Sequence, residues 1–181
     1  MGGKTSYTSE MPGLEEVEAP FYYLSDTSQI PVFKQTSKPS DAMNLQNSRK
    51  PTLMKVRNGR LLDKQPSLNR EGFAFSKQTT KVTDFFNDSE LATIYEPEIE
   101  DLIKKLTGGT EVVVFDHTRR STVPEQREKY NARDPVPAPH SDFSDESAEQ
   151  RMRDVFGNKI GNRLHRRFAM VNAWRSMTSN I

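Results

Sequence analysis

The sequence contains no cysteine in its 181 residues. Disulfide scaffolds, thiolate zinc sites and cysteine nucleophiles are therefore excluded, and a reducing, cytoplasmic compartment is the simplest expectation. Histidine is also scarce, with three in the chain. A protein metal site would have to combine these few histidines with carboxylates.

Long apolar runs and an excess of one charge are missing as well. No stretch approaches the roughly 20 apolar residues that span a bilayer, and the amino terminus lacks the apolar core of a signal peptide. The 26 basic and 25 acidic residues nearly cancel, and the basic ones form no long stripe that could follow a phosphate backbone. We therefore expect neither a membrane nor a nucleic acid as partner.

The composition predicts one modest domain with loosely packed segments. A hydrophobic content of 33% is enough for one core, whereas 28% charged residues and 11 prolines indicate chain outside it. Residues 1–65, rich in Ser, Thr, Pro, Lys and Gln, are predicted to be an extended, weakly packed segment with an edge strand at Phe21–Leu24. Residues 66–181 are predicted to form the folded domain.

Apolar periodicity predicts the elements of this domain. Apolar residues recur at spacings of three and four between Leu91 and Leu106, which predicts helices, with Pro97 starting a second helix and Gly108 ending it. The run Val112–Phe115 predicts a buried strand.

Prolines govern the chain before the next predicted helix. Pro124, Pro135, Pro137 and Pro139 predict a non-helical approach to His140, because proline locks its own φ and restricts the preceding residue. A helix is then predicted from an N-cap at Ser144 to Gly157, and alternating residues over 167–174 predict a strand.

The stretch Pro137–Ser144, PAPHSDFS, places an imidazole and a carboxylate two residues apart. In an extended chain, residues i and i+2 point to the same side, so His140 and Asp142 could both reach one metal ion. Two histidines and one carboxylate hold the iron of non-haem Fe(II) oxygenases. With three histidines in the chain, however, a His-x-Asp arises by chance in about one such sequence in five.

The two other histidines have several interpretations. His117 follows the predicted strand and is a metal ligand, a substrate contact or, as the default, a histidine satisfied by its neighbours. His165 lies in the basic stretch 162–167, where a cation would meet like charge. It also follows Asp142 too closely for a jelly roll to complete the intervening strands, which argues against His165 as the third ligand.

An ordered set of motifs resembles one enzyme family. The motifs are Leu106–Gly109, Val114–Arg120, His140–Phe143 followed by Ala148 and Arg151, and Asn172–Arg175, with Gly72–Phe73 and Val82–Phe85 upstream. Together they resemble the hydroxylase/desaturase family related to cephamycin 7α-methoxylase and to fungal natural-product oxygenases. The resemblance covers residues 41–175 or thereabouts.

The resemblance implies an α+β fold in which a double-stranded β-helix, or jelly roll, incomplete in this chain, is flanked by helices and preceded by the extended segment. It implies an Fe(II) enzyme that uses 2-oxoglutarate and dioxygen to hydroxylate or desaturate a small natural product in secondary metabolism, such as antibiotic or mycotoxin biosynthesis. By this resemblance, His140 and Asp142 correspond to two of the family's iron ligands. Candidate cosubstrate or substrate contacts are Arg119, Asn172, Trp174 and Arg175.

The chain also departs from the family pattern. A second histidine ligand and a basic residue for the cosubstrate are expected well downstream of Asn172–Arg175, and the chain ends six residues after Arg175. We therefore expect a truncated chain that binds Fe(II) weakly, is poorly active or inactive, and needs an oligomer or a partner chain to complete its fold. The alternative is a non-catalytic interaction or regulatory relative of the family.

Overall fold

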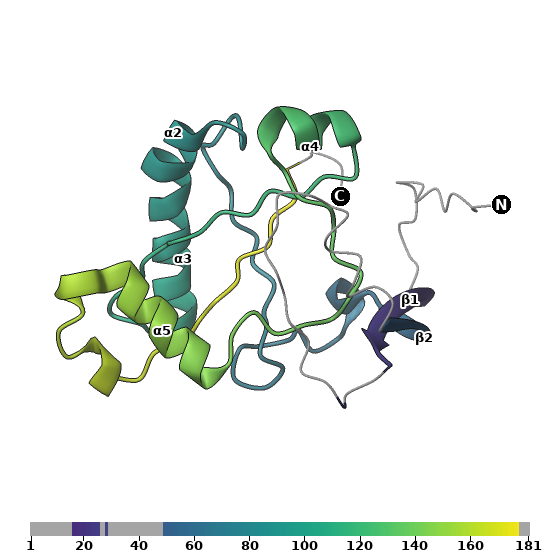
Figure 1. Cartoon of the computed structure of the whole chain (residues 1–181), viewed down its shortest axis with the longest axis horizontal. Helices are drawn as coiled ribbons and strands as arrows, with labels where there is room; N and C mark the ends of the chain where they lie inside the picture. The colour runs from purple at the N-terminus through teal and green to yellow at the C-terminus, as the bar shows by residue number, and fades with distance from the viewer. Residues whose placement is uncertain (1–15, 26–27, 29–48, 178–181) are drawn as a thin grey trace.

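The computed structural model describes residues 16–25, 28 and 49–177 (Figure 1). These residues form two strands and four α-helices, joined by shorter helical turns and long irregular connections. In chain order the elements are β1 (Glu16–Leu24), β2 (Arg49–Arg57), η2 (Gly59–Leu61), α2 (Asp88–Glu90), η3 (Leu91–Tyr95), α3 (Glu96–Thr107), α4 (Pro124–Tyr130), α5 (Asp145–Phe156), η4 (Gly157–Lys159) and η5 (Arg163–His165).

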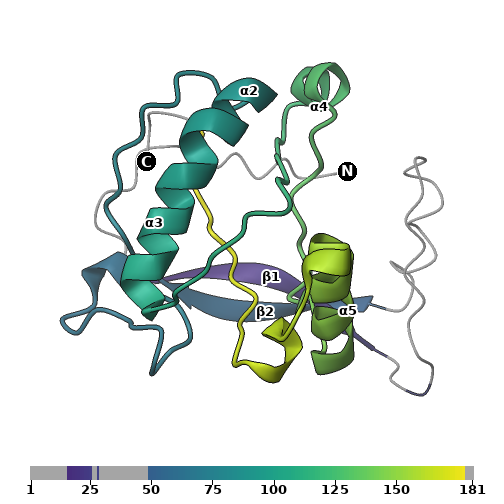
Figure 2. The same ribbon diagram turned by 90° about the vertical axis from the view of Figure 1, so that its left-hand side faces the viewer.

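Strands β1 and β2 form a two-stranded antiparallel ribbon at the side of the molecule away from α3 and α5 (Figure 1), and in Figure 2 it passes behind these helices. Its register pairs Glu16 with Arg57 at one end and Leu24 with Arg49 at the other. The strand predicted at Phe21–Leu24 is confirmed and begins earlier, at Glu16. Strand β2 was not anticipated within the segment predicted to be weakly packed. Most of residues 1–48 lie outside the described residues.

The helices between residues 88 and 107 carry the core. Asn87 caps α2 by accepting hydrogen bonds from the amides of Ser89 and Glu90, and Gly108 ends α3 in the left-handed conformation with φ 73°. Helix α3 begins at Glu96 and directly continues η3, so the second helix predicted to start at Pro97 begins one residue earlier and without a break, with Pro97 in its first turn. Its end at Gly108 follows the prediction. The buried core cluster comprises Val82, Leu91, Tyr95 and Ile99.

Helix α4 corrects the prediction made from Pro124. This proline occupies the first turn of α4, where its missing N–H would have had no helical partner and its fixed φ suits the helix. The later prolines behave as predicted, because residues 135–139 form no helix. Helix α5 also follows its prediction, with Ser144 in a capping box with Ser147 and Gly157 at the end.

The predictions of strands at Val112–Phe115 and over 167–174 are wrong. Both segments run as irregular chain, and the described residues form a single sheet, the β1–β2 ribbon. Apolar content and alternation alone do not make a strand, which requires a neighbour to satisfy its backbone groups. The jelly roll remains a prediction.

Within the described part of the chain, no helix is both long and apolar enough to cross a membrane.

Candidate functional site

The proline run before α5 presents His140 to the surface in a fixed orientation. Ala138 is buried, with 4% of its surface exposed, and its carbonyl accepts a hydrogen bond of 2.9 Å from Nδ1 of His140. A carbonyl oxygen can only accept, so Nδ1 carries the proton. In the neutral imidazole, Nε2 therefore presents a lone pair.

Nε2 lies close to the carboxylate of Asp142. The distance from Nε2 of His140 to Oδ1 of Asp142 is 3.3 Å, and the two side chains are 47% and 43% exposed. Two electron-pair donors in this arrangement repel unless a cation lies between them or the imidazole takes up a proton. The geometry therefore suits either a His140–Asp142 ion pair or a metal ion held by both groups.

Asn172 is brought to the same carboxylate from far along the chain. Its Nδ2 donates a hydrogen bond of 2.5 Å to Oδ2 of Asp142, so each oxygen of Asp142 has a different neighbour. Such a bond fixes the rotation of the carboxylate, as partners of metal ligands commonly do. Of the four candidate contact residues, Asn172 is the one that joins His140 and Asp142 directly.

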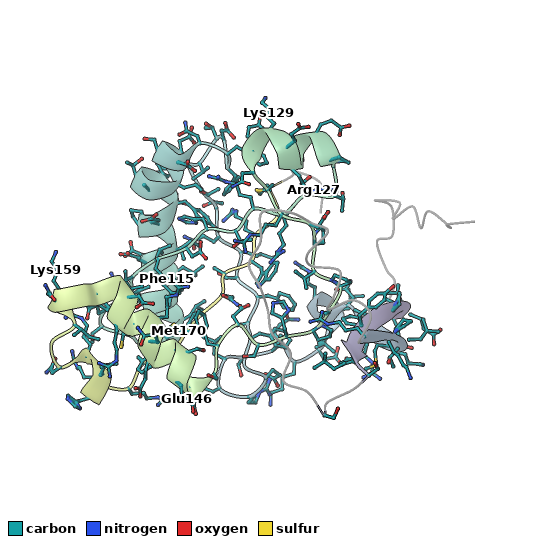
Figure 3. The ribbon with its side chains drawn as sticks, viewed as in Figure 1. Phe115, Arg127, Lys129, Glu146, Lys159 and Met170 are labelled. Atoms are coloured by element: carbon teal, nitrogen blue, oxygen red, sulfur yellow. The ribbon has the colours of Figure 1, made fainter. Side chains whose placement is uncertain are left out.

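These groups lie in an open hollow of about 740 Å³ between α5 and the chain that returns from η5. We call it the His140 hollow. Apart from His140, Asp142 and Asn172, its lining comprises Ser141, Phe143, Ser144, Asp145, Ala148, Glu149, Phe168, Ala169 and Met170. Figure 3 labels Met170 beside α5. Residues 168, 170 and 172 line the hollow from one segment. Their alternation in the sequence indicates that they share a side of the chain, although the segment is not the strand that the alternation predicts.

Arg119 lies elsewhere and serves the packing of the helical region. Its Nε donates a hydrogen bond of 2.8 Å to the carbonyl of Phe85, and its guanidinium pairs with Asp88. This hydrogen-bonded pairing lowers the pKa of the Asp88 carboxyl below its ordinary value. The structure therefore gives Arg119 structural partners rather than a place in the His140 hollow.

The remaining two candidates also lie outside the His140 hollow. Arg175 donates a hydrogen bond of 2.7 Å to the carbonyl of Gln78 and lies over the ring of Phe85. Trp174 is 81% exposed. Neither lines the hollow that holds His140 and Asp142.

The other histidines occupy separate surroundings. Nε2 of His117 lies 3.0 Å from Oε1 of Glu96, which agrees with the default interpretation of a histidine satisfied by its neighbours. His165 ends η5 and is exposed. The described residues hold no group of three or more His, Asp or Glu side chains that could bind a metal ion.

His140 and Asp142 match two positions of an iron site in donor type and spacing. Two neighbouring ligands about 2.1 Å from an octahedral metal lie roughly 3 Å apart, close to the separation of these donors. A third protein donor is not found among the described residues. The pair thus fits part of the ligand set that the resemblance implies.

Curated relatives are fungal proteins. The chain is 27% identical over 127 residues to "Alpha-ketoglutarate-dependent dioxygenase phiK" of Fungal sp. (strain ATCC 74256), covering 68% of this chain and 46% of that protein. It is 24% identical over 131 residues to "Oxidoreductase AN1597" of Emericella nidulans, covering 69% and 44%. It is 28% identical over 149 residues to "Oxidoreductase clz16" of Cochliobolus lunatus, covering 74% and 50%.

The chain spans about half the length of these relatives. No solved structure matches it significantly. A family described as "Oxidoreductase/YMDC permease-like domain" matches residues 21–181. Because this match covers most of the sequence, the chain belongs to the oxidoreductase/YMDC permease-like domain family.

Proposed function

We propose that the chain is part of an oxidoreductase of the 2-oxoglutarate-dependent dioxygenase type, in which His140 and Asp142 bind a catalytic iron. The observation that carries the proposal is the 3.3 Å separation of two potential metal-donor atoms, Nε2 of His140 and Oδ1 of Asp142. The relative named as an alpha-ketoglutarate-dependent dioxygenase supports the same chemistry. The proposed substrate is a small natural product, which is hydroxylated or desaturated.

The residues of the chain have separate tasks in this proposal. Ala138 keeps the proton on Nδ1 of His140, which leaves Nε2 as the ligand atom. Asn172 holds Oδ2 of Asp142 and leaves Oδ1 toward His140. When bound, Fe(II) would supply the open coordination positions at which 2-oxoglutarate and dioxygen react. The His140 hollow would place the substrate beside these positions.

A metal titration tests the proposal directly. The purified chain is titrated anaerobically with Fe(II), or with Co(II) as a spectroscopic substitute, and we expect weak one-to-one binding because two protein donors hold a metal less tightly than three. His140→Ala and Asp142→Ala should each weaken it at least about tenfold. His165→Ala is the matched control, because it removes an exposed imidazole from another part of the chain.

The same titration separates the proposal from the non-catalytic alternative. Paramagnetic broadening by Co(II) should concentrate on residues 140–144, 168–170 and 172, which line the His140 hollow. If His140→Ala leaves metal binding unchanged, the pair is a simple ion pair and the interaction or regulatory function gains support. Tight binding by the wild-type chain would instead contradict the expectation of an incomplete ligand set.

A further inference from the structure

A second hollow lies where the ribbon meets residues 137–140. Its volume is about 420 Å³, and we call it the Arg49 hollow. It is lined by Tyr22, Tyr23, Leu24, Arg49, Pro139 and His140. The amide of Tyr22 donates a hydrogen bond of 3.2 Å to the carbonyl of Pro137, which joins the two walls.

Arg49 is the unusual residue of this hollow. Its Nε is enclosed and has no hydrogen-bond partner. Two of the other three basic residues of β2, Lys55 and Arg57, both pair with Glu16. No carboxylate among the described residues pairs with Arg49. The enclosed Nε is not open to a ligand, but the outer nitrogens of Arg49 are not enclosed and have no partner among the described residues, so they are available to an anion in the hollow.

The walls beside Arg49 determine what kind of anion fits. A guanidinium binds a carboxylate through two parallel hydrogen bonds. Tyr22, Tyr23, Leu24 and Pro139 contribute aromatic and aliphatic surface, which suits an apolar body better than a bare inorganic ion. A volume of about 420 Å³ lies within the range of small-molecule sites, about 300–1,000 Å³.

We propose that the Arg49 hollow binds the carboxylate group of a small organic molecule, with Arg49 as its cation and the ribbon tyrosines as walls. His140 lines both this hollow and the His140 hollow. A molecule held by Arg49 therefore lies next to the imidazole that the proposed function assigns to iron. The inference itself rests on the unpartnered guanidinium and does not require the metal.

The test measures carboxylate binding in the absence of metal, with a chelator present, so its result is independent of the proposed iron site. Benzoate is titrated by ligand-observed NMR, with benzamide as the neutral analogue of the same shape. We expect benzoate to bind and benzamide to bind at least about tenfold more weakly. Arg49→Gln should reduce benzoate affinity at least about tenfold, and Arg49→Lys should fall between, because it keeps the charge without the planar fork.

Lys50→Gln is the matched control. It removes one positive charge from the neighbouring residue, which does not line the Arg49 hollow. We expect this variant to bind benzoate within about twofold of wild type. If Lys50→Gln and Arg49→Gln lose the same affinity, benzoate is attracted by the positive charge of the region in general and not by Arg49 in particular. The proposal is overturned if neither benzoate nor 2-oxoglutarate binds the wild-type chain. It is also overturned if folded Arg49→Gln binds benzoate as tightly as wild type does.

A competition arm identifies the source of the carboxylate. If 2-oxoglutarate displaces benzoate, and if Arg49→Gln binds 2-oxoglutarate more weakly than wild type does, the hollow binds a dicarboxylate such as 2-oxoglutarate. If benzoate binds and 2-oxoglutarate does not compete, the hollow receives an organic monocarboxylate. Both results support carboxylate binding at Arg49. Circular dichroism of each variant establishes that the fold is retained.

Discussion

Arg175 donates a hydrogen bond of 2.7 Å to the main-chain carbonyl of Gln78, which lies 97 positions earlier in the chain. Its guanidinium also lies 5.8 Å from the ring centroid of Phe85. Three positions before Arg175, Asn172 donates to Asp142. The chain over residues 167–177 therefore links the packing of the helical region to the carboxylate of the His140 hollow.

Replacing Arg175 by Ala should loosen this link. We expect faster amide hydrogen exchange over residues 168–177, because the segment loses a charge-assisted hydrogen bond and a cation–π contact without a ladder to hold it. Exchange in α3 should change less. Arg167→Ala is the control, since Arg167 is exposed and belongs to the same segment. Equal acceleration in both variants would show that Arg175 does not anchor the chain.

Leu91→Ala should destabilise the protein strongly, because Leu91 is 5% exposed and belongs to the core cluster. Deletion of a buried leucine side chain typically costs about 2–5 kcal/mol in free energy of unfolding. Leu106→Ala makes the same chemical change near the end of α3, where the side chain is 43% exposed, and should cost about 0.5 kcal/mol or less. Urea denaturation of the two variants compares them, and similar losses would contradict the assigned core.

The local elements that sequence could predict are those with their own chemical signals. Ser144 and Gly157 mark the ends of α5, and Gly108 marks the end of α3. Pro124 gave a misleading signal, because proline favours the first turn of a helix as much as it disfavours the interior. The strands expected near Phe115 and Met170 depended on partners elsewhere in the fold, which local sequence does not specify.

In the candidate site, too, contacts between residues close in the sequence could be predicted, and contacts between distant residues could not. The short spacing of His140 and Asp142 made their proximity predictable, whereas Asn172 contacts Asp142 from 30 positions further along the chain. Arg119 and Arg175 were selected by resemblance, and the structure gives both of them packing partners. The sequence did not indicate Arg49 as a binding residue, because a single arginine in a polar segment belongs to no recognisable motif. Its enclosed Nε becomes visible only in three dimensions.

Arg119→Gln should separate stability from metal binding. The variant loses the hydrogen bond to the Phe85 carbonyl and the pairing with Asp88, so the thermal midpoint should fall by a few degrees. Metal affinity should stay within about twofold of wild type, because Arg119 does not line the His140 hollow. Thermal melting and Co(II) titration of the same sample check both expectations. A selective loss of metal affinity would place Arg119 in the site after all.

The carboxylate of Glu90 should contribute to acid sensitivity. It accepts hydrogen bonds from the amides of Thr83 and Asp84, at 2.6 and 3.2 Å, and from the Thr83 hydroxyl. These bonds lower the pKa of Glu90 below 4.5, with the Thr83 amide as the largest cause. The stabilisation is therefore fully present above pH 4.5 and is lost as the pH falls through the lowered folded-state pKa.

Glu90→Gln tests this by removing the titrating group while keeping an acceptor oxygen. The variant should be less stable than wild type at pH 7, and the difference should shrink as the pH falls below 4.5, because protonation removes the same advantage from the wild-type chain. Denaturant unfolding across this range measures the difference. Glu128→Gln, a carboxylate change in α4, should give a small difference in stability from wild type. A Glu90→Gln difference that stays constant with pH would show that the hydrogen bonds to its carboxylate do not stabilise the turn.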